Sequence, residues 1–408
     1  MSQDFFTSRR KFAKIDFEGL RVGILVSALL EYFKLNNMAA IQYFRSSIKK
    51  MLATPIVQYP EQCISVEGYP IFISILRQDY IEIARNVESQ LSRVNECKVI
   101  EVSLINKAST LRELFKCFSK ALKLTKGLDY KWYEVIYIFS SFYYVLKGVH
   151  RLEQYCSVIP KNAIFFNSSS FPESLLCEYM RSRGAKTFSL QHGMYLKPNI
   201  INYDIVNISN VMADVMLCWG EFSKQEIEKF YLENNLEKKF VCKVAGYPRI
   251  SSYASQAMDC ERAIFVVLPR ILYKAEILKL FDILNKSELT SKIVVKPHPS
   301  VVNDIDVLDA CQAIGAEILS GSLTEWLGVD RYAAVIGFNT TSLFECIESS
   351  EKVLLFRSGN DEFISDLFES FSCENSLNEL VNSSGVLKPS YNFFFADLQS
   401  GYIDCLRS

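Results

Sequence analysis

Two of the three histidines stand at positions where an imidazole could do chemistry. The segment Gln191-His192-Gly193 comes directly after the predicted strand 187–190, and Tyr195 follows. A neutral histidine at the end of a strand can take a proton from a substrate hydroxyl near pH 7. A structural histidine, hydrogen-bonded to backbone in a tight turn, explains the same residues equally well. His192 is therefore a candidate base, with Gln191, Gly193 and Tyr195 as candidate cleft-lining residues.

The segment around His298 suits an anionic ligand better than proton transfer. It reads Lys296-Pro297-His298-Pro299 and follows the apolar run 293–295. The prolines fix the backbone on both sides of the imidazole, and Lys296 adds positive charge beside it. Arg270 follows another apolar run, 264–268, and could neutralise further charge. The pattern predicts a site for a diphosphate or a nucleotide phosphate, whereas a rigid turn with an incidental histidine is the alternative.

A third candidate segment is rich in hydroxyl groups. After the apolar run 333–336 the sequence continues Gly337-Phe338-Asn339-Thr340-Thr341-Ser342 and then enters a predicted helix that contains Glu345. Backbone N–H groups and hydroxyls at a helix start can bind phosphate. A simple helix cap needs one such residue, and here there are three hydroxyls, which favours ligand contact. Glu345 is a candidate cleft-lining residue.

Two further segments end strands but read mainly as turns. Gly246-Tyr247-Pro248-Arg249 closes the run 240–244, and Trp219-Gly220-Glu221 follows the run 215–218. Glycine and proline account for both turns, with Arg249 and Glu221 as candidate cleft-lining residues. Asp304 and Asp306 imitate a D-x-D metal signature, but acids are favoured in the first turn of a helix in any case. We therefore expect no metal.

Composition narrows the function further. The chain has 408 residues, with 45 Lys and Arg against 46 Asp and Glu, so an electrostatic nucleic-acid binder is not expected. Twelve scattered cysteines without a C-x-x-C pair are typical of reduced thiols in the cytoplasm. No phosphate-binding loop, dinucleotide-binding turn, nucleophile elbow or H-E-x-x-H motif occurs. No apolar run is long enough for a transmembrane helix.

The elements that must position these residues alternate between strands and helices. From about residue 160, short β-rich runs alternate with helical segments, as in parallel βαβ units. A polar stretch near residue 252 separates two such series, which predicts two doubly wound domains, 1–250 and 251–390, with an interdomain cleft. The tail 391–408 is expected to pack back onto the body. Residues 16–147 read as mostly helical, and the basic stretch 112–126 suits either an anionic membrane or plain solvent.

Together, the motifs resemble those of the GT-B glycosyltransferases of bacterial capsule and surface polysaccharide assembly. The order is strand-QHG, strand-WG, V-A-G-Y-P-R, strand-KPHP and G-F-N-T-T-S, over roughly residues 160–360. The broad group includes Kdo transferases, bacterial sialyltransferases and polyol phosphate transferases. The resemblance implies that His298, Thr340, Thr341 and Ser342 contact the phosphate of a cytidine nucleotide donor. Lys296, Asn339 and Arg270 are expected to support that contact.

The resemblance also implies a mechanism and partners. The catalytic base comes from the N-terminal domain, where sialyltransferases carry an acidic pair before glycine and this chain has Gln191-His192-Gly193. His192 is thus the expected base of an inverting, metal-independent transfer that needs no cofactor. The expected substrates are a nucleotide-sugar donor, with CMP-linked Kdo or sialic acid foremost, and a glycan or lipid-linked acceptor. The enzyme would work in the cytoplasm, at the inner face of the membrane.

Three alternatives remain open at this point. A polyol phosphate transferase with a CDP donor needs the same phosphate site and base. An enzyme resembling UDP-sugar 2-epimerases would share the two-domain fold but usually places several carboxylates in the cleft. A non-catalytic assembly protein could keep the fold and bind no nucleotide.

Overall fold

The computed structural model describes the chain in two compact units. It covers residues 2–35, 39–126, 130–195, 203–248, 262–327, 332–350, 352–359, 367–383, 389–396 and 401–407. Unit 1 comprises residues 1–195, 200–249 and 396–408, and unit 2 comprises 196–199 and 250–395. The predicted linker at 251–256 lies outside the described residues, as does the candidate Arg249.

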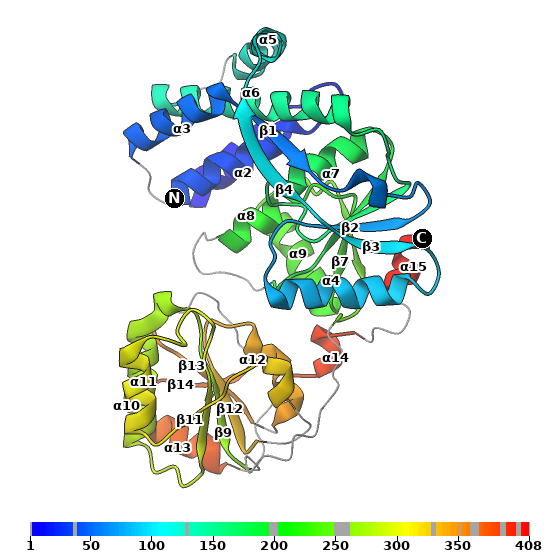
Figure 1. Ribbon diagram of the computed structural model, residues 1–408. Coiled ribbons are helices and arrows are strands. Elements are labelled where there is room, and N and C mark those ends of the chain that lie inside the picture. The colour runs from blue at the N-terminus through cyan, green and yellow to red at the C-terminus, as the bar shows by residue number, and fades with distance from the viewer. Residues whose placement is uncertain are drawn as a thin grey trace. The chain divides into compact units, whose positions relative to one another are not determined.

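Unit 1 is built on a six-stranded parallel sheet in the order β3-β2-β5-β6-β7-β8 (Figure 1). Its central strands are short and mostly buried, and β7 (VMLC) is wholly apolar, because helices cover a parallel sheet on both faces. The strands are β2 (Tyr69–Ile73), β3 (Cys97–Glu101), β5 (Asn162–Phe165), β6 (Lys186–Leu190), β7 (Val215–Cys218) and β8 (Val241–Val244). The connecting helices are α4 (Gln78–Leu91), α7 (Glu173–Ser182), α8 (Tyr203–Ser209) and α9 (Glu221–Glu233). Gly184, at φ +96°, ends α7 in the left-handed conformation that its position after the helix predicts.

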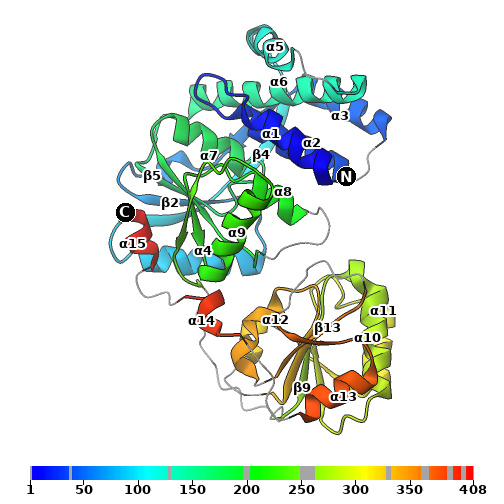
Figure 2. The same ribbon diagram turned by 180° about the vertical axis from the view of Figure 1, so that it is seen from behind.

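A layer of helices packs beside this sheet, as Figure 2 shows from behind. In the sequence, these helices come before β2 and between β3 and β5. The members of this layer are α1 (Ser2–Ala13), α2 (Val22–Leu35), α3 (Ala40–Leu52), α5 (Leu111–Thr125) and α6 (Trp132–Tyr155). Helices α2, α3 and α5 all pack on α6. The expectation that residues 16–147 are mostly helical was too simple, since β2 and β3 join the main sheet. A separate antiparallel ribbon pairs β1 (Ala53–Gln58) with β4 (Ser103–Ala108).

A buried lysine joins three parts of the helical layer. Lys147 of α6 is fully buried, and its Nζ donates to the carbonyls of Lys50 and Met51, at 3.1 and 2.9 Å, and of Ala53. It also donates to Ser109 Oγ at 2.8 Å. The last carbonyls of a helix have no partner within the helix, so a cation placed there satisfies them. Lys147 therefore fixes the end of α3 against α6.

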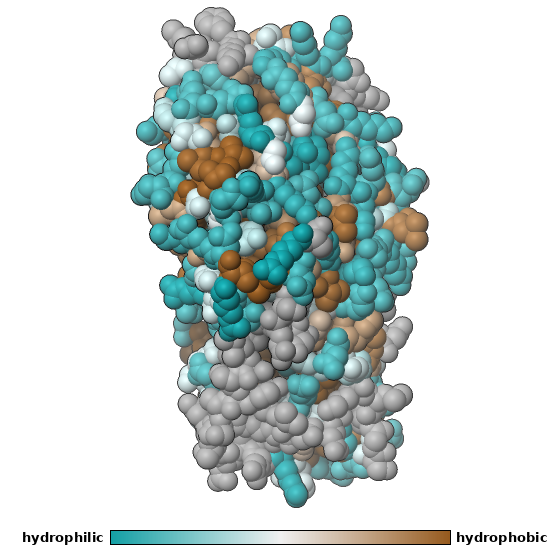
Figure 3. Space-filling view, turned by 90° about the vertical axis from the view of Figure 1, so that its right-hand side faces the viewer, coloured by the Kyte–Doolittle hydropathy of each residue, from teal (hydrophilic) through white to brown (hydrophobic). Residues whose placement is uncertain are grey.

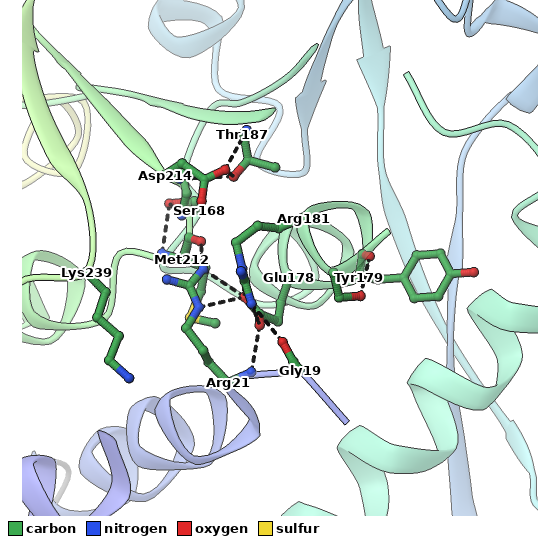
Figure 4. Close-up of polar contacts among 12 residues, drawn as sticks. Gly19, Arg21, Ser168, Glu178, Tyr179, Arg181, Thr187, Met212, Asp214 and Lys239 are labelled. Carbon is green, nitrogen blue, oxygen red and sulfur yellow. Dashed lines mark hydrogen bonds and ion pairs between the residues drawn. The ribbon is translucent and has the colours of Figure 1, made fainter. Parts of the chain in front are cut away.

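An ion-pair cluster holds the N-terminal helices on the sheet (Figure 4). Glu178 of α7 is fully buried and accepts hydrogen bonds from Arg21 Nε and Nη2, at 3.0 and 2.8 Å, and from the Arg21 backbone at 2.6 Å. Arg181 donates to the same carboxylate at 2.6 and 2.9 Å and to the Gly19 carbonyl at 2.9 Å. Arg21 also donates to the Met212 carbonyl. One carboxylate thus ties the start of α2 to α7 and to the segment before β7.

Unit 2 contains a second six-stranded parallel sheet in the order β11-β10-β9-β12-β13-β14. The strands are β9 (Ile264–Val267), β10 (Ile293–Lys296), β11 (Glu317–Ile318), β12 (Ala334–Gly337), β13 (Val353–Phe356) and β14 (Glu369–Phe371). The helices are α10 (Lys274–Lys286), α11 (Ile305–Ala313), α12 (Ser342–Glu345), α13 (Glu374–Asn382) and α14 (Tyr391–Phe394). The two sheets confirm the predicted pair of doubly wound α/β domains.

The chain returns to unit 1 at its end. Ala396 donates to the Trp219 carbonyl at 2.8 Å and accepts from the Tyr247 amide at 3.1 Å. Helix α15 (Gly401–Arg407) then packs beside β8 and α4. The eleven cysteines that the structure describes are free thiols, and no described helix is long and apolar enough to cross a membrane.

Candidate functional site

In unit 2, three of the predicted phosphate-binding segments follow three neighbouring strands. Strand β9 lies between β10 and β12, and all three run parallel. Arg270 follows β9, His298 follows β10 and Asn339 follows β12, so the three segments share one edge of the sheet. Successive strands depart in opposite directions from β9, which makes this the topological switch point where such sheets bind ligands.

The surroundings of His298 fix which ring nitrogen carries hydrogen. Its Nδ1 accepts from the Ser300 amide at 3.1 Å and lies 2.9 Å from Ser300 Oγ. Because Nδ1 accepts from the amide, it carries no hydrogen, and Ser300 Oγ, which itself accepts from the Ile271 amide at 3.0 Å, is the donor in its contact with Nδ1. With Nδ1 accepting, the neutral imidazole carries its hydrogen on Nε2. The same bonds tie the segment after β10 to the segment after β9, next to Arg270.

Lys296 and Arg270 supply the positive charge at this edge. Lys296 is the last residue of β10 and is partly buried, whereas Arg270 is exposed. Burial lowers the pKa of Lys296, and the carboxylate of Glu325 opposes that shift. A partly desolvated cation interacts more strongly with an anion than one in open water, because the local dielectric constant is lower.

The hydroxyl-rich segment after β12 has a tight backbone. A Cβ on Gly337 would lie 2.7 Å from Val267 Cγ2 of β9, so the two strands can approach this closely only at glycine. Asn339 adopts φ +44°, and Thr340 Oγ1 accepts from the Ser342 amide at 3.3 Å. Thr341 precedes α12, which contains only four residues and includes the buried Glu345. The predicted helix 343–348 is therefore broken, and its dipole contributes less than expected.

In unit 1, His192 lies at the corresponding edge, just after β6. Its ring is surrounded by the rings of Tyr80, Phe166 and Tyr195, with centroids 6.0, 5.8 and 6.4 Å away. Nε2 lies 3.5 Å from Asn167 Nδ2, and the enclosed Nδ1 has no hydrogen-bond partner within the described ranges. Burial lowers the pKa of His192 to about 4; the Leu190 backbone opposes this and the charge of Arg77 adds to it.

At the same edge of the sheet, the structure places a carboxylate that the sequence analysis missed. Glu173, the first residue of α7, is fully buried; its Oε1 accepts from the Ser74 amide and hydroxyl at 2.8 and 2.7 Å. Its Oε2 accepts from the Asn167 amide at 2.7 Å. Ser74 follows β2 and Asn167 comes just after β5, so Glu173 bridges the strand pair where the order of this sheet reverses. Burial raises the pKa of Glu173 to about 7, against these hydrogen bonds, which favour the carboxylate.

The remaining predicted residues of unit 1 have structural partners. Gln191 is fully buried, donates to Ser223 Oγ and the Gly193 carbonyl, both at 2.8 Å, and accepts from the Trp219 amide at 2.7 Å. It therefore fixes the turn that carries His192. Glu221 begins α9 and pairs with Lys224 at 2.8 Å.

The D-x-D pair serves as a helix start and an ion pair. Asp304 caps α11 by accepting from the Val307 amide, and Lys274 Nζ lies 2.9 Å from Asp304 and 2.5 Å from Asp306. Across the described ranges, His, Cys, Asp and Glu side chains form no cluster of three or more that could hold a metal. A cavity of about 820 Å³ in unit 1, lined by Tyr59, Glu101 and Arg151 among others, contains none of the predicted site residues.

The comparisons with known proteins concern the fold. No family model and no curated protein sequence matches the chain. A UDP co-structure of MnaA from S. aureus aligns with a TM-score of 0.52 at 12% identity, over 83% of this chain and 95% of that chain. The UDP-N-acetylglucosamine 2-epimerase of Rickettsia bellii gives 0.49 at 12%, over 84% and 96%. The lipopolysaccharide outer core galactosyltransferase WaaB gives 0.45 at 11%, over 83% and 98%. With its two six-stranded parallel sheets, the chain has the two-domain GT-B fold.

Proposed function

We propose that this chain is an inverting, metal-independent glycosyltransferase that uses a nucleotide-activated sugar. The observation that carries the proposal is the edge of the unit 2 sheet, where Arg270, Lys296 and His298 are joined by Thr340, Thr341 and Ser342 from neighbouring strands. Cations, an imidazole N–H and hydroxyls are the donors that a phosphate ester needs. The position at a switch point of the sheet supports the same assignment.

In the proposed reaction, the two histidines serve one transfer. His192 takes the proton of the acceptor hydroxyl while the acceptor oxygen forms its bond to the anomeric carbon. The bond from that carbon to the nucleotide phosphate oxygen breaks, and the phosphate keeps the electron pair. His298 Nε2–H, Lys296 and the hydroxyls of Thr340 and Ser342 stabilise the negative charge of the leaving nucleotide.

For the donor, we propose a CMP-linked ulosonic acid such as Kdo or sialic acid, with a surface polysaccharide or lipid-linked glycan as acceptor. The support is the likeness of the KPHP and N-T-T-S segments to those of the capsule transferase group. The identity of the donor is the most specific part of the proposal, because selectivity between donors depends on the shape of the pocket around the sugar and the base.

The test is a binding screen followed by turnover. We expect CMP to raise the midpoint of thermal unfolding more than CDP, UDP or GDP at the same concentration, because the nucleotide with the lowest Kd stabilises the folded protein most. A ligand at 100 times its Kd stabilises the folded protein by about 2.7 kcal/mol. CMP-Kdo, CMP-sialic acid, CDP-glycerol and UDP-sugars are then offered in turn with a glycan acceptor, and nucleotide release is measured. No shift with any nucleotide would favour a non-catalytic protein, and epimerisation of a UDP-sugar without acceptor would refute transfer.

The tautomer of His298 gives a finer prediction. Ser300→Ala removes the hydroxyl that donates to Nδ1 but keeps the amide that does the same, so nucleotide affinity is expected to fall about 2- to 10-fold. His298→Ala removes the phosphate contact itself and is expected to weaken binding further. Lys286→Ala is the matched control, because Lys286 pairs with Asp282 on the exposed side of α10 and should leave the Kd unchanged. Equal affinity of the His298→Ala and wild-type proteins for CMP would contradict the assignment.

A further inference from the structure

Helix α3 exposes a row of large apolar side chains. Ile41, Phe44, Ile48 and Leu52 are all exposed, Leu52 to 65%, and their spacing of three or four residues places them along one face of the helix. The opposite face holds the buried Tyr43, whose ring packs at 5.4 Å from the rings of both Tyr133 and Tyr137 of α6. An outward helix face is normally polar, so four exposed apolar residues in a row indicate a contact surface.

The charged residues of α3 itself have one sign. Arg45 and Lys49 follow Phe44 and Ile48 directly in the sequence and are exposed. Helix α3 contains three basic residues and no aspartate or glutamate (AIQYFRSSIKKML). An apolar row on a helix whose only charges are basic is complementary to a surface that is apolar inside and anionic outside.

Two neighbouring elements of the same layer repeat this pattern. On α5, Phe118 and Leu122 are exposed one turn apart, and Lys123 and Lys126 are exposed beside them. Trp132, the first residue of α6, is 66% exposed and follows the exposed Lys131. Helices α3 and α5 both pack on α6, and Figures 1 and 2 both place the three helices at one end of unit 1. The coloured atoms of the face in Figure 3 are mostly hydrophilic, with separate hydrophobic patches among them.

We propose that this end of unit 1, which we call the α3–α5 surface, docks on an anionic membrane. The apolar row would enter the boundary between headgroups and acyl chains, Trp132 would sit at the interface, and the lysines and Arg45 would meet lipid phosphates. A second copy of the same surface fits less well, because two basic surfaces repel each other. The inference goes beyond the proposed transfer reaction and does not depend on it.

The test is co-sedimentation of the full chain with vesicles. We expect binding to vesicles of phosphatidylcholine mixed with phosphatidylglycerol, little binding to phosphatidylcholine alone, and weaker binding as salt is added. Phe44→Ser combined with Ile48→Ser should lower the partition coefficient by about tenfold or more, since apolar burial is lost. Arg45→Gln with Lys49→Gln should lower it about fivefold for each charge removed.

The matched control is Leu232→Ser on α9. Leu232 is 83% exposed but lies between acidic residues, Glu228 and Glu233, so its replacement should not change sedimentation. Equal sedimentation of the wild type and the Phe44→Ser, Ile48→Ser variant, or none of the wild type, would overturn the inference. So would a wild-type dimer that this variant dissociates, because the occupant would then be a second copy. Unchanged CMP binding in the variant separates this test from that of the transferase reaction.

Discussion

Replacing His192 by alanine is expected to lower turnover by about 100- to 10,000-fold, the usual contribution of a positioned general base. The imidazole is held between Tyr80, Phe166 and Tyr195, with Nε2 near Asn167. Because burial lowers its pKa to about 4, the ring is neutral at pH 7 and able to accept a proton. The measurement is the rate of nucleotide release at saturating donor, with CMP affinity and the unfolding midpoint as checks on folding.

The pH dependence of turnover separates His192 from the buried Glu173. A group with a pKa of about 4 loses its neutral form only below that pH, so kcat/KM should stay level from pH 7 down to about 5 if His192 is the base. Glu173, with a pKa of about 7, would instead give an acid limb near neutrality. The base would be Glu173 instead if two results were found together. The His192→Ala variant would keep near-normal turnover, and the pH profile of kcat/KM would fall on the acid side near pH 7 in the wild type but not in the Glu173→Gln variant.

Replacing Glu178 by alanine is expected to destabilise unit 1 by about 3–5 kcal/mol, the usual cost of removing one partner of a buried ion pair. Arg21 is buried with it and would lose both side-chain contacts to the carboxylate, which Arg181 also contacts (Figure 4). The cost arises because buried guanidinium groups would be left without their anion. The measurement is the denaturant dependence of amide hydrogen exchange in α7, which reports on unit 1 by itself.

Two comparisons show whether burial causes this loss. Asp282→Ala breaks an exposed pair with Lys286 and should cost at most about 1 kcal/mol. Glu178→Leu combined with Arg21→Met replaces the pair with apolar side chains and should recover part of the stability, although Arg181 keeps its charge. A cost below about 1 kcal/mol for Glu178→Ala would mean that the cluster contributes no more than a surface pair.

The sequence predicted the fold best where the local hydrophobic pattern of a segment matches its burial in the folded protein. Strands such as 215–218 and 264–267 are wholly apolar because helices cover both faces, and this produces the runs from which both sheets were predicted. Strand β4 has no such signal, because most of its side chains are exposed and its partner β1 lies some 50 residues earlier. Such a ribbon is specified by pairing between distant segments, which a local pattern does not contain.

The candidate site divides in the same way. His298 and Asn339 could be located because each directly follows an apolar strand. Glu173 could not be distinguished, because an acid in the first turn of a helix is favoured by the dipole in any case. The signal that was available is the polar run from Asn167 to Ser170 just before it, at the end of a strand. The hydrogen bonds between Glu173 and Ser74 join residues that are 99 positions apart in the sequence, and only the folded structure shows them.

The hydrogen bonds of Ala396 have a practical consequence for dissecting the protein. The Tyr247 amide reaches the Ala396 carbonyl at 3.1 Å, so the two points where the chain leaves and re-enters unit 1 are neighbours. The larger segment of unit 2, residues 250–395, is thus inserted between two neighbouring points of unit 1, and a few flexible residues from Pro248 to Ala396 would connect unit 1 without it. A C-terminal truncation, by contrast, would remove α15 from unit 1. Deleting residues 250–395 internally is therefore a better way to obtain unit 1 alone than shortening the chain from its end.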